Sequence, residues 1–259
     1  MRTAKTVLTV IQERGKQKKP IERVYKLLFN RELYLNAYAK LYPNNGAMTK
    51  GVTNETVDGM SIQKIDRMIE ILREEKYQWK PARREYIKKK NGKKRPLGIP
   101  VWGDKVLQEV MRQILEAYYE PQFSEHSHGF RPNRGCHTAL QEIQVWKGTR
   151  WFIEGDISQY FDTIDHKILL EILARNIHDG RFIRLVSNML EAGYLEEWKF
   201  KQTISGVPQG GVISPILANI YLNEFDNWIE EVLIPKYTKG KRQKSNPEYN
   251  KLTAEIQKL

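Results

Sequence analysis

The chain has 259 residues, 40% of them hydrophobic, with enough tryptophan and tyrosine for a sizeable core. Its single cysteine excludes a disulfide framework, and no apolar run is long enough to cross a membrane. We therefore expect an intracellular protein, cytoplasmic or in an organelle. Residues 1–100 hold 24 lysines and arginines against 10 acids, and residues 101–259 hold 19 against 21. Such a basic half indicates a polyanion partner, commonly nucleic acid, or only a solvated surface.

The first 100 residues predict helices followed by a hairpin. Residues 21–41 have apolar positions near helical spacing, and Ser61 is placed to cap a helix over residues 62–77. Next comes REYIKKKNGKKRPLGIP, in which Asn91 and Gly92 predict a two-residue type I′ turn between two basic strands. Lysines on such a hairpin either protect an edge strand or contact phosphate.

The remaining residues alternate helices with short extended segments. Apolar spacing predicts helices near residues 104–120, 137–146, 164–173 and 181–193, and one long helix near 212–233 with Pro215 in its first turn. Residues 151–153 and 194–204 read as strands, the first of them at least half-buried. The basic tail ends in a late helical piece.

Asp156 lies between the predicted strand 151–153 and the helix 164–173, in the segment EGDISQYFD. A carboxylate at this place is either a helix cap or a ligand for a metal ion. Asp162, Thr163 and Asp165 are the better placed residues to cap the helix that follows.

Four segments call for a common interpretation: the hairpin with RPLGIP, the loop SHGFRPNRG followed by HTAL, EGDISQYFD, and GVPQGGVISPILANIYL. In this order they resemble the reverse transcriptases encoded by group II introns, also called intron maturases, over nearly the whole chain. The resemblance implies a right-hand polymerase of α/β (α+β) class, helix-rich, with a small antiparallel sheet. It implies an RNA-binding extension at residues 1–80, fingers at 81–150 and an incomplete palm at 151–259.

The resemblance also assigns roles around the palm. Asp156 matches the catalytic aspartate that binds Mg²⁺, with the Ile157 carbonyl facing the same ion. Phe161 matches the ring that excludes a 2′-hydroxyl, although a buried phenylalanine is more often plain core. Gln209 matches the glutamine that contacts the incoming nucleotide, in a segment that is also a tight turn before a helix.

Several cations are implied to bind phosphate. The resemblance implies that cations of the fingers bind the triphosphate, and the sequence does not decide which of the candidates do so. These candidates are Arg83, Arg84, Lys89 and Arg95. Arg131 and Arg134 are candidates for template or triphosphate contact. Three lysines near the N-terminus either contact RNA or DNA or are simply solvated: Lys16, Lys18 and Lys19.

A zinc site is the alternative for one cluster, which comprises His126, His128, Cys136 and His137. Their spacing matches no common structural zinc pattern, and the family needs no zinc there. We therefore do not predict one.

The family's palm has a second metal motif with two adjacent aspartates, and the sequence contains no such pair. One carboxylate cannot hold the two Mg²⁺ ions of polymerase chemistry. We expect an N-terminal portion of a longer RNA-directed DNA polymerase that assists splicing and retrohoming. Its partners would be group II intron RNA, template–primer and deoxynucleoside triphosphates.

This chain alone is then expected to bind RNA without polymerase activity, and exposed apolar surface is expected to favour a homodimer. The alternatives are a non-catalytic RNA-binding splicing cofactor and a reverse transcriptase of another lineage, such as a retron or CRISPR-associated enzyme.

Overall fold

The structure is a computed structural model that describes residues 2–88, 92, 94–146, 152–197, 199–203, 205–207, 210–238 and 246–257. It divides into two compact units, Met1–Asn223 and Glu224–Leu259. Neither predicted domain boundary, at residue 80 or at residue 150, coincides with the division between these two units, so the domain boundaries stay predictions. None of the described helices combines the length and apolar character needed to cross a bilayer.

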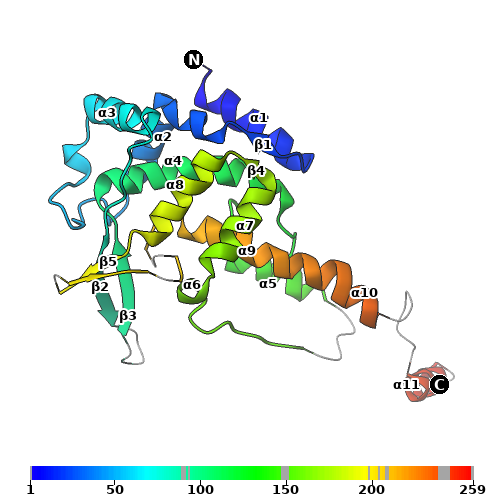
Figure 1. The fold of residues 1–259 in the computed structure, drawn as a ribbon. Helices are drawn as coiled ribbons and strands as arrows, with labels where there is room; N and C mark the ends of the chain where they lie inside the picture. Colours follow the sequence, from blue (N-terminus) through cyan, green and yellow to red (C-terminus); the bar gives the residue numbers. More distant parts are fainter. Residues whose placement is uncertain are drawn as a thin grey trace. The chain divides into compact units, whose positions relative to one another are not determined.

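Helix α4 (Trp102–Tyr119) is the centre of the first unit. Its apolar stripe, predicted from the sequence, is fully buried at Val106, Leu107, Val110, Met111, Ile114 and Leu115. Helices α1 (Ala4–Lys16) and α2 (Arg31–Leu41) pack on it, as Figure 1 shows. A Cβ at Gly15 of α1 would lie 2.1 Å from the Tyr118 carbonyl oxygen, so only glycine lets the two helices approach this closely.

The rest of the N-terminal layer follows the predicted order. Strand β1 (Ile21–Glu22) leads to a 3-10 helix η1 (Val24–Phe29) before α2, and a second 3-10 turn η2 (Val57–Gly59) precedes α3 (Ile62–Arg73). The Ser61 hydroxyl accepts a hydrogen bond from the Lys64 amide at 3.2 Å, which confirms the predicted cap.

The basic hairpin is formed by β2 (Ala82–Lys88) and β3 (Lys94–Ile99). These strands pair with Lys88 opposite Lys94, whereas a two-residue turn at Asn91 and Gly92 would place Lys88 opposite Arg95. The hairpin is therefore confirmed, and Asn91 of its predicted two-residue turn lies outside the described residues. Gly92 has φ +77°, which suits the longer loops that end in a left-handed residue.

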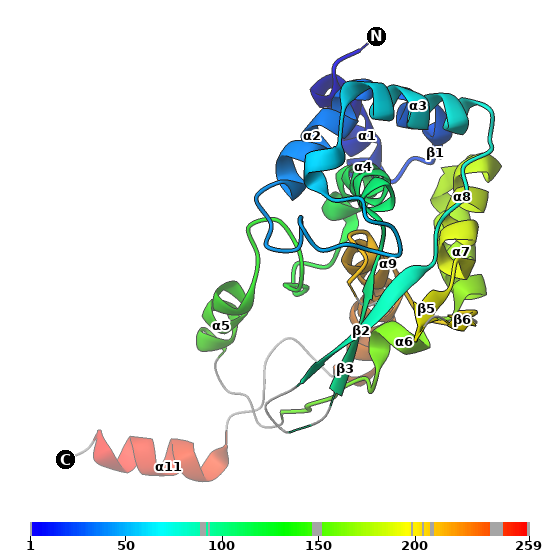
Figure 2. The same cartoon turned by 90° about the vertical axis from the view of Figure 1, so that its left-hand side faces the viewer.

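The predicted strand at residues 194–204 is instead a short hairpin. Strands β5 (Tyr194–Glu196) and β6 (Lys199–Lys201) pair antiparallel, and Glu197 between them has φ +50°, which reverses the chain. Because β5 also pairs in parallel with β2, the sheet has the order β3-β2-β5-β6. The β2–β3 hairpin extends away from the helices (Figure 2).

A run of helices follows α4 in the chain. It comprises η3 (Glu120–Gln122), α5 (Cys136–Gln144), α6 (Tyr160–Thr163), α7 (His166–Asn176) and α8 (Gly180–Glu191). The Asp165 carboxylate accepts from the Ile168 amide at 3.0 Å, so it is the cap of α7 among the three predicted candidates. Gly193, with φ +70°, follows the end of α8 as predicted. Strand β4 (Ile177–His178) pairs in parallel with β1.

The predicted buried strand at residues 151–153 is wrong over its described part. Phe152 and Ile153 are 69% and 93% exposed, and residues 152–157 have no regular structure. A strand is stable only when a neighbouring strand satisfies its backbone, and no described strand pairs with this segment.

The predicted long helix is α9 (Ser214–Trp228), with Pro215 in its first turn. It crosses into the second unit, which continues as a π-helical turn η4 (Ile229–Leu233), α10 (Ile234–Tyr237) and the late helix α11 (Pro247–Ile256). The π turn adds one residue per turn and interrupts the helix that the sequence predicted as continuous.

Candidate functional site

Two of the motif segments, EGDISQYFD and GVPQGGVISPILANIYL, are joined by hydrogen bonds at α6. The Gly206 amide donates to the Ile164 carbonyl, and the Val207 amide donates to the Phe161 carbonyl, both at 2.8 Å. The His166 Nε2 lies 2.7 Å from the Gly206 carbonyl oxygen. The chain thus brings together residues about 40 positions apart, and Gly206 fixes the loop that leads to Gln209.

The third segment, RPLGIP, forms β3 and lies against the same loop. A Cβ at Gly210 would lie 2.7 Å from both the Gly98 carbonyl oxygen and a Leu97 methyl group. Glycine at this position lets the loop and the strand touch. Gln209 itself lies outside the described residues.

The fingers cations divide between the two faces of the β2–β3 hairpin. Residues opposite each other in an antiparallel pair share a face, so Arg83 and Arg95 lie on one face with Leu97. Arg84 lies on the other face. The structure therefore does not bring these three arginines to one point, and Lys89 lies outside the described residues.

A cavity lies on each face. The Leu97 side has a cavity of about 210 Å³ that includes Gly210, Lys105 and the loop of residues 44–49. The Arg84 side has one of about 310 Å³ that includes Asp162 and the loop at 205–207. In it, the Arg84 guanidinium stacks 3.6 Å over the Tyr194 ring.

Lys105, which the sequence reasoning missed, holds the loop of the first cavity. Its ammonium donates to the Gly46 and Thr49 carbonyls at 3.1 and 3.2 Å, and Arg83 donates to the Lys50 carbonyl at 3.0 Å. Burial, and then the charge of Arg83, lowers the pKa of Lys105. In the sequence, Lys105 directly precedes the apolar stripe of α4, and this position could have indicated that its side chain is partly buried.

Asp156 and Ile157 lie in the exposed coil before α6, and Ile157 is 51% exposed. Within the described residues, no three acidic, histidine or cysteine side chains are grouped so that they could hold a metal ion. The roles of Asp156 and of the Ile157 carbonyl as ligands of Mg²⁺ therefore stay predictions.

Phe161 is half-buried in α6. Its ring packs edge-on against Tyr160 and Phe130, with centroids 5.8 and 6.4 Å apart. Phe130 belongs to the loop SHGFRPNRG and is 72% exposed, so this aromatic pair joins that loop to the motif segments. The packing suits both interpretations of Phe161, core residue and gate.

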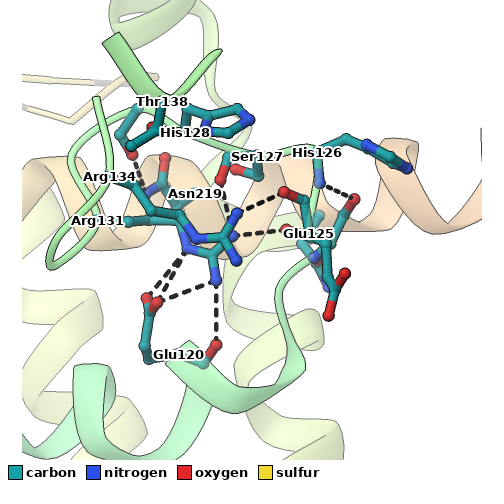
Figure 3. Close-up of polar contacts among 12 residues, drawn as sticks. Glu120, Glu125, His126, Ser127, His128, Arg131, Arg134, Thr138 and Asn219 are labelled. Atoms are coloured by element: carbon teal, nitrogen blue, oxygen red, sulfur yellow. Dashed lines mark hydrogen bonds and ion pairs between the residues drawn. The ribbon is translucent and has the colours of Figure 1, made fainter. Parts of the chain in front are cut away.

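Arg131 is the buried anchor of the loop SHGFRPNRG (Figure 3). Its Nε and Nη2 donate to the Glu120 carboxylate, with the shortest of these bonds at 2.9 Å, and Nη2 also faces the Glu120 carbonyl. Nη1 donates to the carbonyls of Ser124 and Ser127 at 2.5 and 2.7 Å. All three nitrogens are thus used within the chain, so the geometry supports a positioning role for Arg131 in place of direct phosphate contact.

The other predicted nucleic-acid contacts lie at the surface. Arg134 donates through Nη1 to the Glu125 carbonyl and is exposed enough to reach a ligand. Lys16 ends α1 and pairs with Glu13 at 2.7 Å, and the exposed Lys18 and Lys19 follow it. The Tyr118 hydroxyl donates to the Lys19 carbonyl at 3.0 Å, so the backbone here is fixed.

The histidines of the loop contact Glu142 of α5. The His128 Nε2 lies 2.8 Å from one carboxylate oxygen and the His126 Nδ1 contacts the other. Hydrogen bonds from His128 and then His126 lower the pKa of Glu142. Glu142 and Glu120, which the sequence reasoning missed, are therefore the acidic partners that fix this loop on both sides.

The motif loops of the chain thus meet at β3 and α6. Residues 87–241 match the family described as reverse transcriptase (RNA-dependent DNA polymerase). Because the match spans more than half of the sequence, the chain belongs to that family.

Curated relatives narrow the comparison. The chain is 47% identical to the group II intron-encoded protein LtrA of Lactococcus lactis subsp. cremoris over 239 residues, which are 92% of this chain and 40% of the relative. It is 47% identical to an uncharacterized 91 kDa protein in the cob intron of Schizosaccharomyces pombe, covering 88% of this chain and 29% of that one. The chain therefore spans well under half the length of these two relatives.

Among solved structures, the partial Cas6-RT-Cas1–Cas2 complex has a chain that superimposes with a TM-score of 0.53 at 20% identity. The match covers 80% of this chain and 35% of the other. At that identity the likeness shows the fold alone.

Proposed function

We propose that this chain supplies the RNA-binding extension, the fingers and part of the palm of a group II intron reverse transcriptase. The whole protein would copy RNA into DNA and assist splicing and retrohoming of its intron. The observation that carries the proposal is the hydrogen-bonded contact of residues 205–207 with residues 161–164, which places two polymerase motifs side by side. The 47% identity to an intron-encoded relative supports the intron lineage.

The metal chemistry belongs to the whole protein. Divalent ions, expected to be two Mg²⁺, stabilise the attacking and leaving oxygens in polymerases of this kind. Asp156 and the Ile157 carbonyl would hold part of that site. The two adjacent aspartates of the family's second metal motif, which would supply the other ligands, do not occur in this sequence.

The RNA-binding part of the proposal is tested by filter binding across a salt series. The chain is compared on a folded group II intron RNA and on an unrelated structured RNA. We expect the intron RNA to bind more tightly, and the preference to persist as salt weakens the phosphate contacts common to both. Equal affinities that fade together would mean that the basic half is only an electrostatic anchor and would refute recognition by this chain.

The catalytic part makes a second prediction. In a primer-extension assay with Mg²⁺ and all four deoxynucleoside triphosphates, we expect no synthesis by this chain alone, because a single carboxylate does not fix two ions. Synthesis that disappears in Asp156→Asn would contradict this, and Asp58→Asn, which changes an acid outside the motif segments, is the matched control.

A non-catalytic splicing cofactor is the second candidate. It is favoured by one observation, the basic N-terminal layer of residues 1–100 packed on α4. Preference for intron RNA without polymerase activity in the whole protein would establish it. The self-association expected from exposed apolar side chains stays a prediction.

A further inference from the structure

A cavity of about 490 Å³ lies away from the motif segments, between α3, residues 76–80 and the first turn of α4. Pockets of this size accept small organic ligands, including a nucleotide. Nothing in the proposed polymerase chemistry uses it. Its basic side chains are Lys64, Arg67, Lys76 and Lys80.

Two of these cations are already neutralised. Lys64 pairs with Glu55 at 3.1 Å, and Lys76 pairs with Glu74 at 3.0 Å. By contrast, neither the Arg67 guanidinium nor the Lys80 ammonium makes an ion pair or a side-chain hydrogen bond to any residue that the structure describes. Both side chains are exposed, and because the charge of Lys80 also acts on the Asp104 carboxylate, Arg67 has the charge that is most available to an anion.

The cavity also contains donors without acceptors. Helix α4 begins here, and its N-cap residue Val101 provides no side-chain acceptor for the amides of the first turn. Trp102, only 3% exposed, lines this cavity and also the one on the Leu97 side of the hairpin, and its indole N–H has no hydrogen-bond partner in the described part of the chain. An acceptor-rich group such as phosphate complements these donors.

Part of the cavity's lining is apolar, and the Asp104 carboxylate in it already accepts hydrogen bonds from the chain. Met60, Met68 and the Tyr77 ring supply surfaces on which a base or ribose can lie. Asp104 accepts from the Tyr77 hydroxyl at 2.7 Å and from the Lys80 amide at 3.0 Å, so both of its oxygens are engaged. This leaves the phosphate to the Arg67 side.

We propose that this cavity binds one nucleotide unit of single-stranded RNA, with its phosphate at Arg67 and Lys80 and its base over the apolar part of the lining. The inference rests on the RNA binding proposed above and gives it a place between the N-terminal extension and the fingers. It predicts a discrete contact in addition to the diffuse attraction of the basic half.

The test uses a short labelled single-stranded RNA that carries 4-thiouridine, with affinity measured across a salt series. Arg67→Gln should weaken binding by about five- to tenfold and lower the salt slope by about one. Arg73→Gln is the matched control, because it removes the same charge from the same helix. Arg73 pairs with Glu70 at 3.2 Å and lies over the Phe29 ring outside the cavity. The control should change affinity less than twofold.

Photocrosslinks should map to residues 60–80 or to Trp102, and should be lost in Arg67→Gln. Equal weakening by the two variants, or crosslinks elsewhere, would overturn the site. If the unaltered chain prefers intron RNA, and Arg67→Gln binds the short RNA as tightly as the unaltered chain does, only this inference fails. If the unaltered chain binds neither the intron RNA nor the short single-stranded RNA, the proposed function and this inference both fail.

Discussion

Replacing Arg131 with alanine should destabilise the chain by about 3 kcal/mol, since removing one partner of a buried ion pair leaves the other without compensation. The side chain of Arg131 is 4% exposed, and that of its partner Glu120 is 23% exposed, so water recovers part of the loss. The carbonyls of Ser124 and Ser127 also lose their donor. Lysine cannot restore the network, because an ammonium has three donors and lacks the planar geometry of the guanidinium.

Urea denaturation measures this effect, with Arg134→Ala as the matched control in the same loop. Arg134 is half-buried and makes one side-chain hydrogen bond, so its loss should cost less than about 1 kcal/mol. Comparable small losses in the two variants would show that Arg131 does not anchor the loop. In that case direct nucleic-acid contact, the role expected from the sequence, would again be the better account of Arg131.

The sequence predicted those parts of the fold that local patterns determine. The α4 stripe, the Ser61 and Asp165 caps and the Gly193 helix end depend on residues within a few positions of each other, and all are observed. The strand at residues 151–153 and the single strand at 194–204 failed. Pairing between distant segments decides whether an extended run becomes a strand, and a single sequence does not show that pairing.

The candidate site shows the same limit. Motif strings identified Asp156, Phe161 and the loop near Gln209, and the structure joins two of those segments at α6. Strings could not show that Arg95 shares a face with Arg83 and not with Arg84, because the hairpin register decides it. Nor could they show that Arg131 is buried, because its partner Glu120 lies eleven residues away in another element.

Substitution of Gly206 is expected to have the second large effect on stability, because Gly206 lies in the contact between the two polymerase motifs. Its φ of +89° is unfavourable for any residue with a Cβ, and a Cβ there would lie 2.8 Å from the Phe161 and Asp162 carbonyl oxygens. These are backbone atoms that cannot rotate away. Gly206→Ala should therefore destabilise the chain by about 2 kcal/mol or more through backbone strain and lost hydrogen bonds.

Gly180→Ala is the control for Gly206→Ala. Gly180 opens α8, and a Cβ there meets no atom within 4 Å, so alanine should be neutral or stabilise by up to about 1 kcal/mol. Hydrogen exchange at the Gly206 and Val207 amides localises the effect, since both donate to the α6 segment. Faster exchange at these two amides, with the α4 amides still protected, would show that the motif contact opens before the core unfolds. Unchanged exchange and stability in Gly206→Ala would mean that the loop tolerates a side chain, and the contact could then not be what positions Gln209 for a nucleotide.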